Sequence, residues 1–222
     1  MVMTRHDQIA ANLQIVQQHI AGAAEMAGRD VNEITLIAVT KTFPISDVEI
    51  LQKLGVTNFG ENRDADAAPK ALAVPGTWHF QGQIQSNKLK SICTWAHTIH
   101  SLDEIKHFQV IEKNAVHPLE IFCQVSLDGA DGRGGVSGQE LYALAQAVEN
   151  SPTHTLAGLM AVAPLGVEPA QAFAKLAVLH KAFIADFPRA NKLSAGMSGD
   201  FKEAIAHGAT HIRVGSSILG SR

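Results

Sequence analysis

Lys41 is the residue whose position first suggests chemistry. It follows the apolar run Leu36–Val39, which is typical of a parallel strand buried on both faces. Pro44 then ends the strand, so the lysine amine lies where the strand leaves the core. An amine at that point is a candidate nucleophile for a carbonyl group, with which it forms an imine. The alternative is a solvated surface charge, because most lysines are exposed.

Two segments rich in glycine and serine suggest an anion site. The stretch SAGMSG (194–199) leads into a helical pattern, and RVGSS (213–217) follows a predicted strand. Both offer small side chains and accessible backbone N–H groups, which bind phosphate well. Together with the Lys41 amine they indicate a phosphorylated carbonyl compound bound as an imine. The alternatives are that Ser198 is only a helix N-cap and that Arg213 pairs with an inward acidic residue, for which Glu61 is a candidate.

The elements that must position these groups alternate along the chain. Eight short apolar runs predict strands at 34–40, 56–60, 77–82, 97–101, 119–127, 155–162, 191–196 and 211–216. Helical periodicity separates them, and a further helix over residues 4–28 comes first, with a capping box at Thr4 and Asp7 and a stop at Gly28. The S-x-x-E patterns at Ser46, Ser101 and Ser137 predict the starts of three later helices.

This alternation predicts a single α/β domain over residues 1–222, a (β/α)8 barrel of the TIM type with an extra N-terminal helix. An open doubly wound sheet is the structural alternative. In a barrel the functional groups lie at the C-terminal ends of the strands, where Lys41 and both anion-binding segments fall.

The composition excludes several functional classes. The net charge is −3 without a basic block, so neither nucleic acid nor an anionic membrane is an expected partner. No apolar run approaches the roughly 18 residues of a spanning helix, and the N-terminus lacks the apolar core of a signal peptide. Cys93 and Cys123 form no C-x-x-C, so a reduced cytoplasmic location is expected. No metal site is expected, because H-E-x-x-H and C-x-x-C are both absent from the sequence.

Six segments of the sequence resemble a known family. They are AVTK (38–41), GEN (60–62), WHFQGQIQSNK (78–88), GLMAV (158–162), SAGMSGD (194–200) and IRVGSSILGSR (212–222). In content and order they are similar to the pyridoxal phosphate homeostasis proteins (YggS/PROSC type), from the first helix to the final arginine. The long polar motif at 78–88 is the most specific part. The resemblance implies the barrel of the alanine racemase N-terminal domain and pyridoxal 5′-phosphate (PLP) as cofactor.

The resemblance also implies seven cofactor-binding residues. Lys41 would carry PLP as a Schiff base, while Ser198, Gly215 and Ser216 would hold the phosphate. Arg213 would lie beside the pyridine nitrogen, Asn62 near the ring, and Met160 in the pocket wall. The sequence departs from the family pattern at Arg133, where many relatives have a lysine that is assigned to a second cofactor site. It also departs at Gly199, where an acidic residue is common, and it has no basic C-terminal tail.

Three functions remain open. The favoured one is a cofactor-binding protein that buffers PLP or delivers it to apo-enzymes, acting as a monomer without catalytic turnover. The others are a racemase-like PLP enzyme and a barrel aldolase that uses Lys41 on a sugar phosphate. A PLP enzyme needs an acid or base at the substrate Cα, and usually a carboxylate at the ring nitrogen. Arg213 is expected there instead, the only tyrosine, Tyr142, falls in a helix, and the sequence ends six residues after Ser216, so no catalytic residue is expected.

Overall fold

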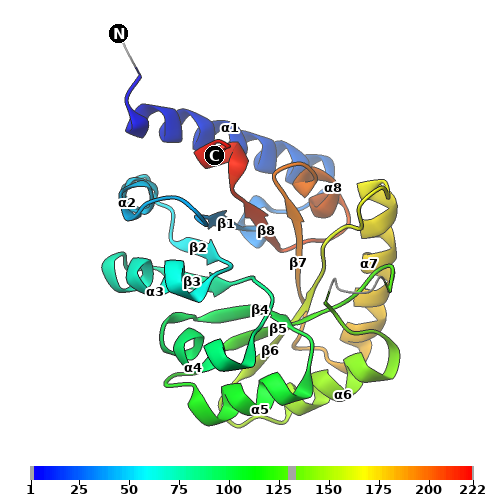
Figure 1. Ribbon diagram of the computed structural model, residues 1–222. Helices are drawn as coiled ribbons and strands as arrows, with labels where there is room; N and C mark the ends of the chain where they lie inside the picture. Colours follow the sequence, from blue (N-terminus) through cyan, green and yellow to red (C-terminus); the bar gives the residue numbers. More distant parts are fainter. Residues whose placement is uncertain (1–2, 130–133, 222) are drawn as a thin grey trace.

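Eight parallel strands close into a barrel in which each strand pairs with its neighbours in sequence and β8 returns to β1 (Figure 1). The computed structural model describes residues 3–129 and 134–221. The strands are β1 Thr35–Val39, β2 Asn58–Glu61, β3 Thr77–Phe80, β4 Thr98–Leu102, β5 Glu120–Gln124, β6 Thr155–Met160, β7 Lys192–Met197 and β8 His211–Val214. All eight predicted strands are therefore confirmed, and the open-sheet alternative is wrong.

The helices surround this barrel, and one follows each strand (Figure 1). They are α1 Arg5–Met26, α2 Ile45–Lys53, α3 Asp64–Ala73, α4 Ser86–Trp95, α5 Ile105–Asn114, α6 Gly138–Glu149, α7 Pro169–Asp186, α8 Phe201–Ala206 and α9 Ser216–Leu219, with a 3₁₀ turn η1 at Val31–Glu33. Parallel strands require such crossovers, because a two-residue hairpin cannot join them.

The extra N-terminal helix α1 is present and packs against α8 and α9, beside the C-terminal end of the chain (Figure 1). Its capping box forms as predicted, because the Thr4 hydroxyl accepts the Asp7 N–H and the Asp7 carboxylate accepts the Thr4 N–H. Gly28 follows the helix with a φ of +65°, a conformation that glycine adopts without strain. Asn12 donates to the Ile218 carbonyl at 3.0 Å, so α1 fixes the turn that follows β8.

The predicted helix starts are confirmed at two of three positions. Ser46 lies in the first turn of α2, which begins at Ile45 after the N-cap Pro44. Ser137 is the N-cap of α6, although its side chain makes no capping hydrogen bond. The prediction at Ser101 is wrong, because Ser101 belongs to β4 and Glu104 is the N-cap of α5. The buried strand, rather than the local side chains, decides where α5 begins.

The apolar core forms two clusters. The larger one lies between the strands and the helices and includes fully buried side chains such as Leu51 and Phe183. The smaller one consists of Phe122, Ala157 and Met160 on the adjacent strands β5 and β6. No helix in the described part of the chain is long and apolar enough to span a bilayer.

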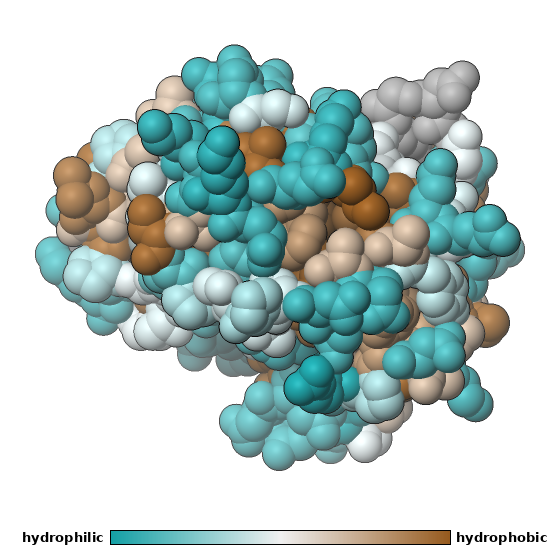
Figure 2. Space-filling view, turned by 90° about the horizontal axis from the view of Figure 1, so that it is seen from below, coloured by the Kyte–Doolittle hydropathy of each residue, from teal (hydrophilic) through white to brown (hydrophobic). Residues whose placement is uncertain are grey.

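The face seen from below the view of Figure 1 carries hydrophobic residues in small groups separated by hydrophilic ones (Figure 2). Leu72, Val116 and Val178 are among the exposed large hydrophobic side chains. Scattered exposed apolar side chains are normal on a protein surface, whereas a broad continuous patch marks an interface.

Candidate functional site: a cavity at the strand ends

A cavity of about 480 Å³ lies at the C-terminal ends of the barrel strands. All seven residues that the sequence analysis selected line it: Lys41, Asn62, Met160, Ser198, Arg213, Gly215 and Ser216. They come from segments following or ending β1, β2, β6, β7 and β8, so only the closed barrel brings them together. The wall also includes Val39, Gln81, Val162, Met197 and Gly199.

Lys41 lies just beyond β1 and is exposed. Within residues 3–129 and 134–221 its ammonium has no hydrogen bond or ion pair, so nothing in the described chain competes for the amine. Thr42 follows with a φ of +68°, which is uncommon for a residue other than glycine. The chain therefore turns sharply directly after the lysine.

The residue before Lys41 is held by a buried ion pair. The Thr40 hydroxyl donates to Glu61 Oε1 at 2.6 Å, and the Lys70 ammonium donates to the Thr40 carbonyl at 2.8 Å. Lys70 also binds Glu61 Oε1 at 2.6 Å, with both side chains almost completely buried. Burial raises the pKa of Glu61, and the hydrogen bonds from Lys70 and Thr40 oppose this shift. Glu61 is therefore the partner of Lys70 and not of Arg213, and the pair fixes the base of the Lys41 side chain.

An anion cradle forms where the segments after β7 and β8 meet. Ser198 Oγ accepts hydrogen bonds from the N–H groups of Gly215 at 3.2 Å and Ser217 at 3.4 Å. Two backbone donors thus converge on the Ser198 hydroxyl at the cavity wall, and converging N–H groups of this kind favour an anion. A Cβ on Gly215 would lie 3.1 Å from the Val39 carbonyl oxygen, so glycine allows the close approach of β8 to β1. A Cβ on Gly199 would meet nothing within 4 Å. Glycine in place of the acidic residue that is common in the family therefore leaves the backbone of the cradle intact.

Arg213 lies on β8 and is buried. Its guanidinium donates to Ser194 Oγ at 2.7 Å and to the Ala161 carbonyl at 3.0 Å, which are both neutral acceptors. No carboxylate of the described chain forms an ion pair with it, so the alternative of an acidic partner is wrong. Burial lowers the pKa of Arg213 to about 10, and the more distant Asp200 opposes this shift. The residue is still a cation at neutral pH, and its charge faces the cavity without compensation.

Two polar atoms in the cavity wall have no hydrogen-bond partner although they are buried: Asn62 Oδ1 and Gln81 Nε2. Buried polar groups are normally paired, so an unpaired acceptor and an unpaired donor in one wall point to a polar ligand. Gly60 has no side chain that would obstruct Gln81, because a Cβ there would lie 2.9 Å from the Gln81 amide. The sequence analysis quoted Gln81 within its most specific motif but assigned it no role.

Tyr142 lies on α6, where its ring packs against Phe183 and Phe187 of the α7 region at centroid distances of 6.2 and 6.1 Å. It does not line the cavity at the strand ends. The expectation that this tyrosine is remote from the site is therefore confirmed. Arg133, where the sequence departs from the family pattern, lies outside the described residues.

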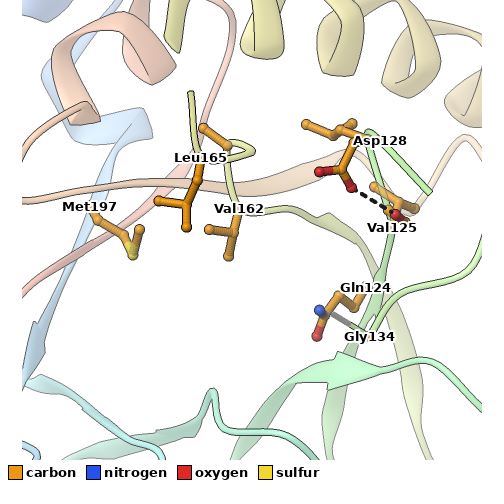
Figure 3. Close-up of a pocket in the computed structure, with 10 residues that line it drawn as sticks. Gln124, Val125, Asp128, Gly134, Val162, Leu165 and Met197 are labelled. Atoms are coloured by element: carbon orange, nitrogen blue, oxygen red, sulfur yellow. Dashed lines mark hydrogen bonds between the residues drawn. The ribbon is translucent and has the colours of Figure 1, made fainter. Parts of the chain in front are cut away.

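A second, more apolar cavity of about 310 Å³ adjoins the first. Val162 and Met197 line both cavities, and Figure 3 shows these two side chains and Leu165 on one side, with Gln124 and Asp128 on the other. The polar protein groups described above, which could bind a ligand, therefore line the first cavity. The second cavity extends the first along the ends of β5 and β6.

One group of side chains has the composition of a metal site. Asp103, Glu104 and His107 place possible ligand atoms within 4.8 Å of one another. However, Glu104 pairs with Lys106 at 2.5 Å, and Asp103 accepts the Gly135 N–H at 3.1 Å. Because both carboxylates already have partners, we propose no metal site there.

The fold and this cavity define the class of protein. The family described as "Alanine racemase, N-terminal domain" matches residues 5–222, so the chain belongs to this family. Among curated relatives, the pyridoxal phosphate homeostasis protein of Mycobacterium leprae is 39% identical over 241 residues, covering 97% of this chain and 93% of that protein. The predicted resemblance is thus confirmed.

Solved structures agree with this assignment. PipY of Synechococcus elongatus, in a structure with PLP bound, has a TM-score of 0.81 and 29% identity, covering 96% of this chain and 100% of that one. Alanine racemase from Corynebacterium glutamicum has a TM-score of 0.74 at 13% identity and covers 96% of this chain and 60% of that one. The likeness to alanine racemase shows the fold alone.

Proposed function

We propose that this chain binds PLP through Lys41 and serves in PLP homeostasis, holding the cofactor reversibly and supplying it to apo-enzymes without turnover of its own. The observation that carries the proposal is the convergence of an unpaired lysine, a cradle of backbone N–H groups and an uncompensated arginine in one cavity. The names of the curated relatives and the PLP-bound structure of PipY support it.

The residues present fit the cofactor. PLP carries an aldehyde, a dianionic phosphate and a ring nitrogen, and when bound it supplies an aldehyde that condenses reversibly with amines. Lys41 would provide the amine and Ser198, Gly215 and Ser216 the phosphate contacts, while Arg213 would face the ring nitrogen. The unpaired atoms of Asn62 and Gln81 would gain partners on the ring substituents. Met160, which is buried, would form part of the apolar wall.

Two features favour a carrier over a racemase-like enzyme. Arg213 keeps a positive charge where a PLP enzyme usually places a carboxylate, and a cation there disfavours protonation of the ring nitrogen. The single tyrosine packs between α6 and α7, so it cannot act as a base in this cavity. Because α-proton removal needs both a positioned base and an electron sink, little exchange chemistry is expected.

The proposal extends to the setting of the protein. We treat residues 1–222 as one PLP-binding domain that acts as a monomer in the cytoplasm, with PLP and apo PLP-dependent enzymes as its partners. Buried Cys93 and Cys123, whose thiol pKa values burial raises to about 11 and about 12, need no oxidised partner.

The experiment is to titrate the purified protein with PLP and then to add L-alanine in D₂O. We expect an absorption band of a lysine-bound PLP and transfer of the cofactor to an apo PLP enzyme that regains activity. Incorporation of α-deuterium should stay within about tenfold of the rate with free PLP, because loss of a general base typically removes 10²–10⁴-fold. Exchange at many turnovers per second, or formation of D-alanine, would contradict the carrier function.

A further inference from the structure

A line of hydrogen-bonded side chains runs from Arg213 through the inside of the barrel. Ser194 Oγ lies 2.7 Å from Arg213 and 2.8 Å from His100 Nδ1. His100 Nε2 lies 2.9 Å from His79 Nδ1, and His79 Nε2 lies 3.0 Å from Asn58 Oδ1. We call these five residues the interior chain. Since β5 and β6 separate His100 on β4 from Ser194 on β7 in the sheet, their contact crosses the barrel interior.

The direction of every hydrogen bond in the interior chain follows from its two ends. A guanidinium only donates, so Ser194 Oγ accepts from Arg213 and gives its own proton to His100 Nδ1. His100 then donates from Nε2 to His79 Nδ1. His79 donates from Nε2 to the Asn58 carbonyl oxygen, which only accepts. All contacts are satisfied when both histidines are neutral and carry their proton on Nε2.

The surroundings keep both histidines neutral. Burial lowers the pKa of His79 to about 3, with His211, His97 and Lys192 adding repulsion. Burial lowers the pKa of His100 well below its ordinary value, and the nearby charges of His79, Arg213, His211 and Lys192 act in the same direction. The ring of Phe122 also stacks on the His100 imidazole, with the ring centroids 4.5 Å apart.

This arrangement is unusual for a barrel interior, which large aliphatic side chains normally fill. Burying several polar groups is unfavourable unless each is hydrogen-bonded, and an aliphatic interior would avoid that requirement. Unlike a carboxylate, the interior chain holds the guanidinium through the neutral Ser194 hydroxyl and leaves the positive charge of the arginine in place.

We propose that Ser194, His100 and His79 are positioning residues that orient Arg213 toward the cofactor ring nitrogen and leave its positive charge uncompensated. This proposal rests on the proposed function, because it explains how the ring nitrogen is kept unprotonated and the bound PLP unreactive. Breaking the interior chain frees the guanidinium to turn away, and the ring nitrogen then becomes accessible to a proton.

The first test uses the unmodified protein without PLP. Nitrogen NMR of the histidine rings between pH 8 and pH 5 should show His79 and His100 neutral, with the proton on Nε2 in both. An Nδ1–H tautomer at either residue, or a ring that is protonated at pH 6, overturns the proposal. This result does not depend on PLP binding, so it stands apart from the test of the proposed function.

The second test uses PLP labelled with ¹⁵N at the ring nitrogen. His100→Phe keeps a ring against Phe122 but removes both nitrogens, and Ser194→Ala breaks the contact with Arg213. His154→Phe is the matched control, because His154 is also buried but accepts the Leu119 N–H and lies outside the interior chain.

In the wild type and the control, the ring nitrogen should resonate as an unprotonated pyridine. In His100→Phe and Ser194→Ala it should move toward the protonated position, and the Kd for PLP should rise about tenfold. Variants that weaken binding yet keep the wild-type ring-nitrogen shift would show a merely structural role and overturn the proposal. If His100→Phe does not fold, Ser194→Ala decides.

Discussion

Acidification should destabilise the cofactor-free protein through its buried histidines. Burial lowers the pKa of His79 to about 3 and that of His211 to about 4, against an ordinary value of 6.5. A histidine with a lowered pKa binds fewer protons in the folded state than in the unfolded chain. The free energy of unfolding is therefore at its full value above about pH 6.5 and falls as the pH drops toward 4 and 3.

The size of the effect follows from the width of this window. At about 1.5 pH units below the ordinary pKa of histidine, protonation stabilises the unfolded chain by about 2 kcal/mol for each histidine, at roughly 1.36 kcal/mol per unit. His79 and His211 together should cost about 4 kcal/mol between pH 7 and pH 5, and His100 adds to this loss. Since domains are typically stable by only about 5–15 kcal/mol, the decrease should be easy to measure. Glu61, whose pKa burial raises, contributes with the opposite sign.

The assay is urea unfolding at pH 7, 6 and 5, followed by the fluorescence of the buried Trp78 and Trp95. The comparison that isolates the histidine effect is His79→Gln, which should reduce the loss between pH 7 and pH 5 by about 2 kcal/mol. In this difference the contribution of Glu61 cancels. An equal pH dependence in wild type and His79→Gln would refute the reasoning.

Two further predictions concern the phosphate cradle and the base of Lys41. Ser198→Ala should weaken PLP binding by about one charged hydrogen bond, roughly 1.5–3 kcal/mol by isothermal titration, with pyridoxal hardly affected; equal loss for both ligands would make Ser198 only a structural cap. Lys70→Met leaves the buried Glu61 carboxylate unpaired and should lower the free energy of unfolding by about 3–5 kcal/mol in urea titrations. Removing one partner of the Arg189–Glu149 pair, as in Arg189→Met, should cost under about 1 kcal/mol because Arg189 is exposed, and a similar loss in both variants would contradict this account.

The barrel could be predicted from the sequence because each strand is a short apolar run and the runs recur at similar spacing. The helix α3 carries little signal in the sequence, since it contains Pro69 and buries only Ala67 and Lys70. The strand ends also indicated the site, because in a closed parallel barrel they converge on one face.

The interactions behind the site could not be predicted. The Glu61–Lys70 pair joins a strand to a helix whose buried face carries little apolar signal. His100 lies on β4 and is buried, whereas His97 precedes that strand and is exposed. Nothing local indicates that His100 contacts Ser194, 94 residues away, because that contact depends on closure of the barrel.

The central claim is that Lys41 carries PLP, and borohydride reduction followed by peptide mapping tests it most directly. Reduction of the PLP-loaded protein should fix one cofactor on the peptide that contains Lys41. Lys41→Ala should abolish the adduct while unfolding like the wild type, because an exposed lysine without partners in the described chain contributes little to stability. An adduct on Lys88 or Lys90 in the wild type, or an undiminished adduct in Lys41→Ala, would contradict the account.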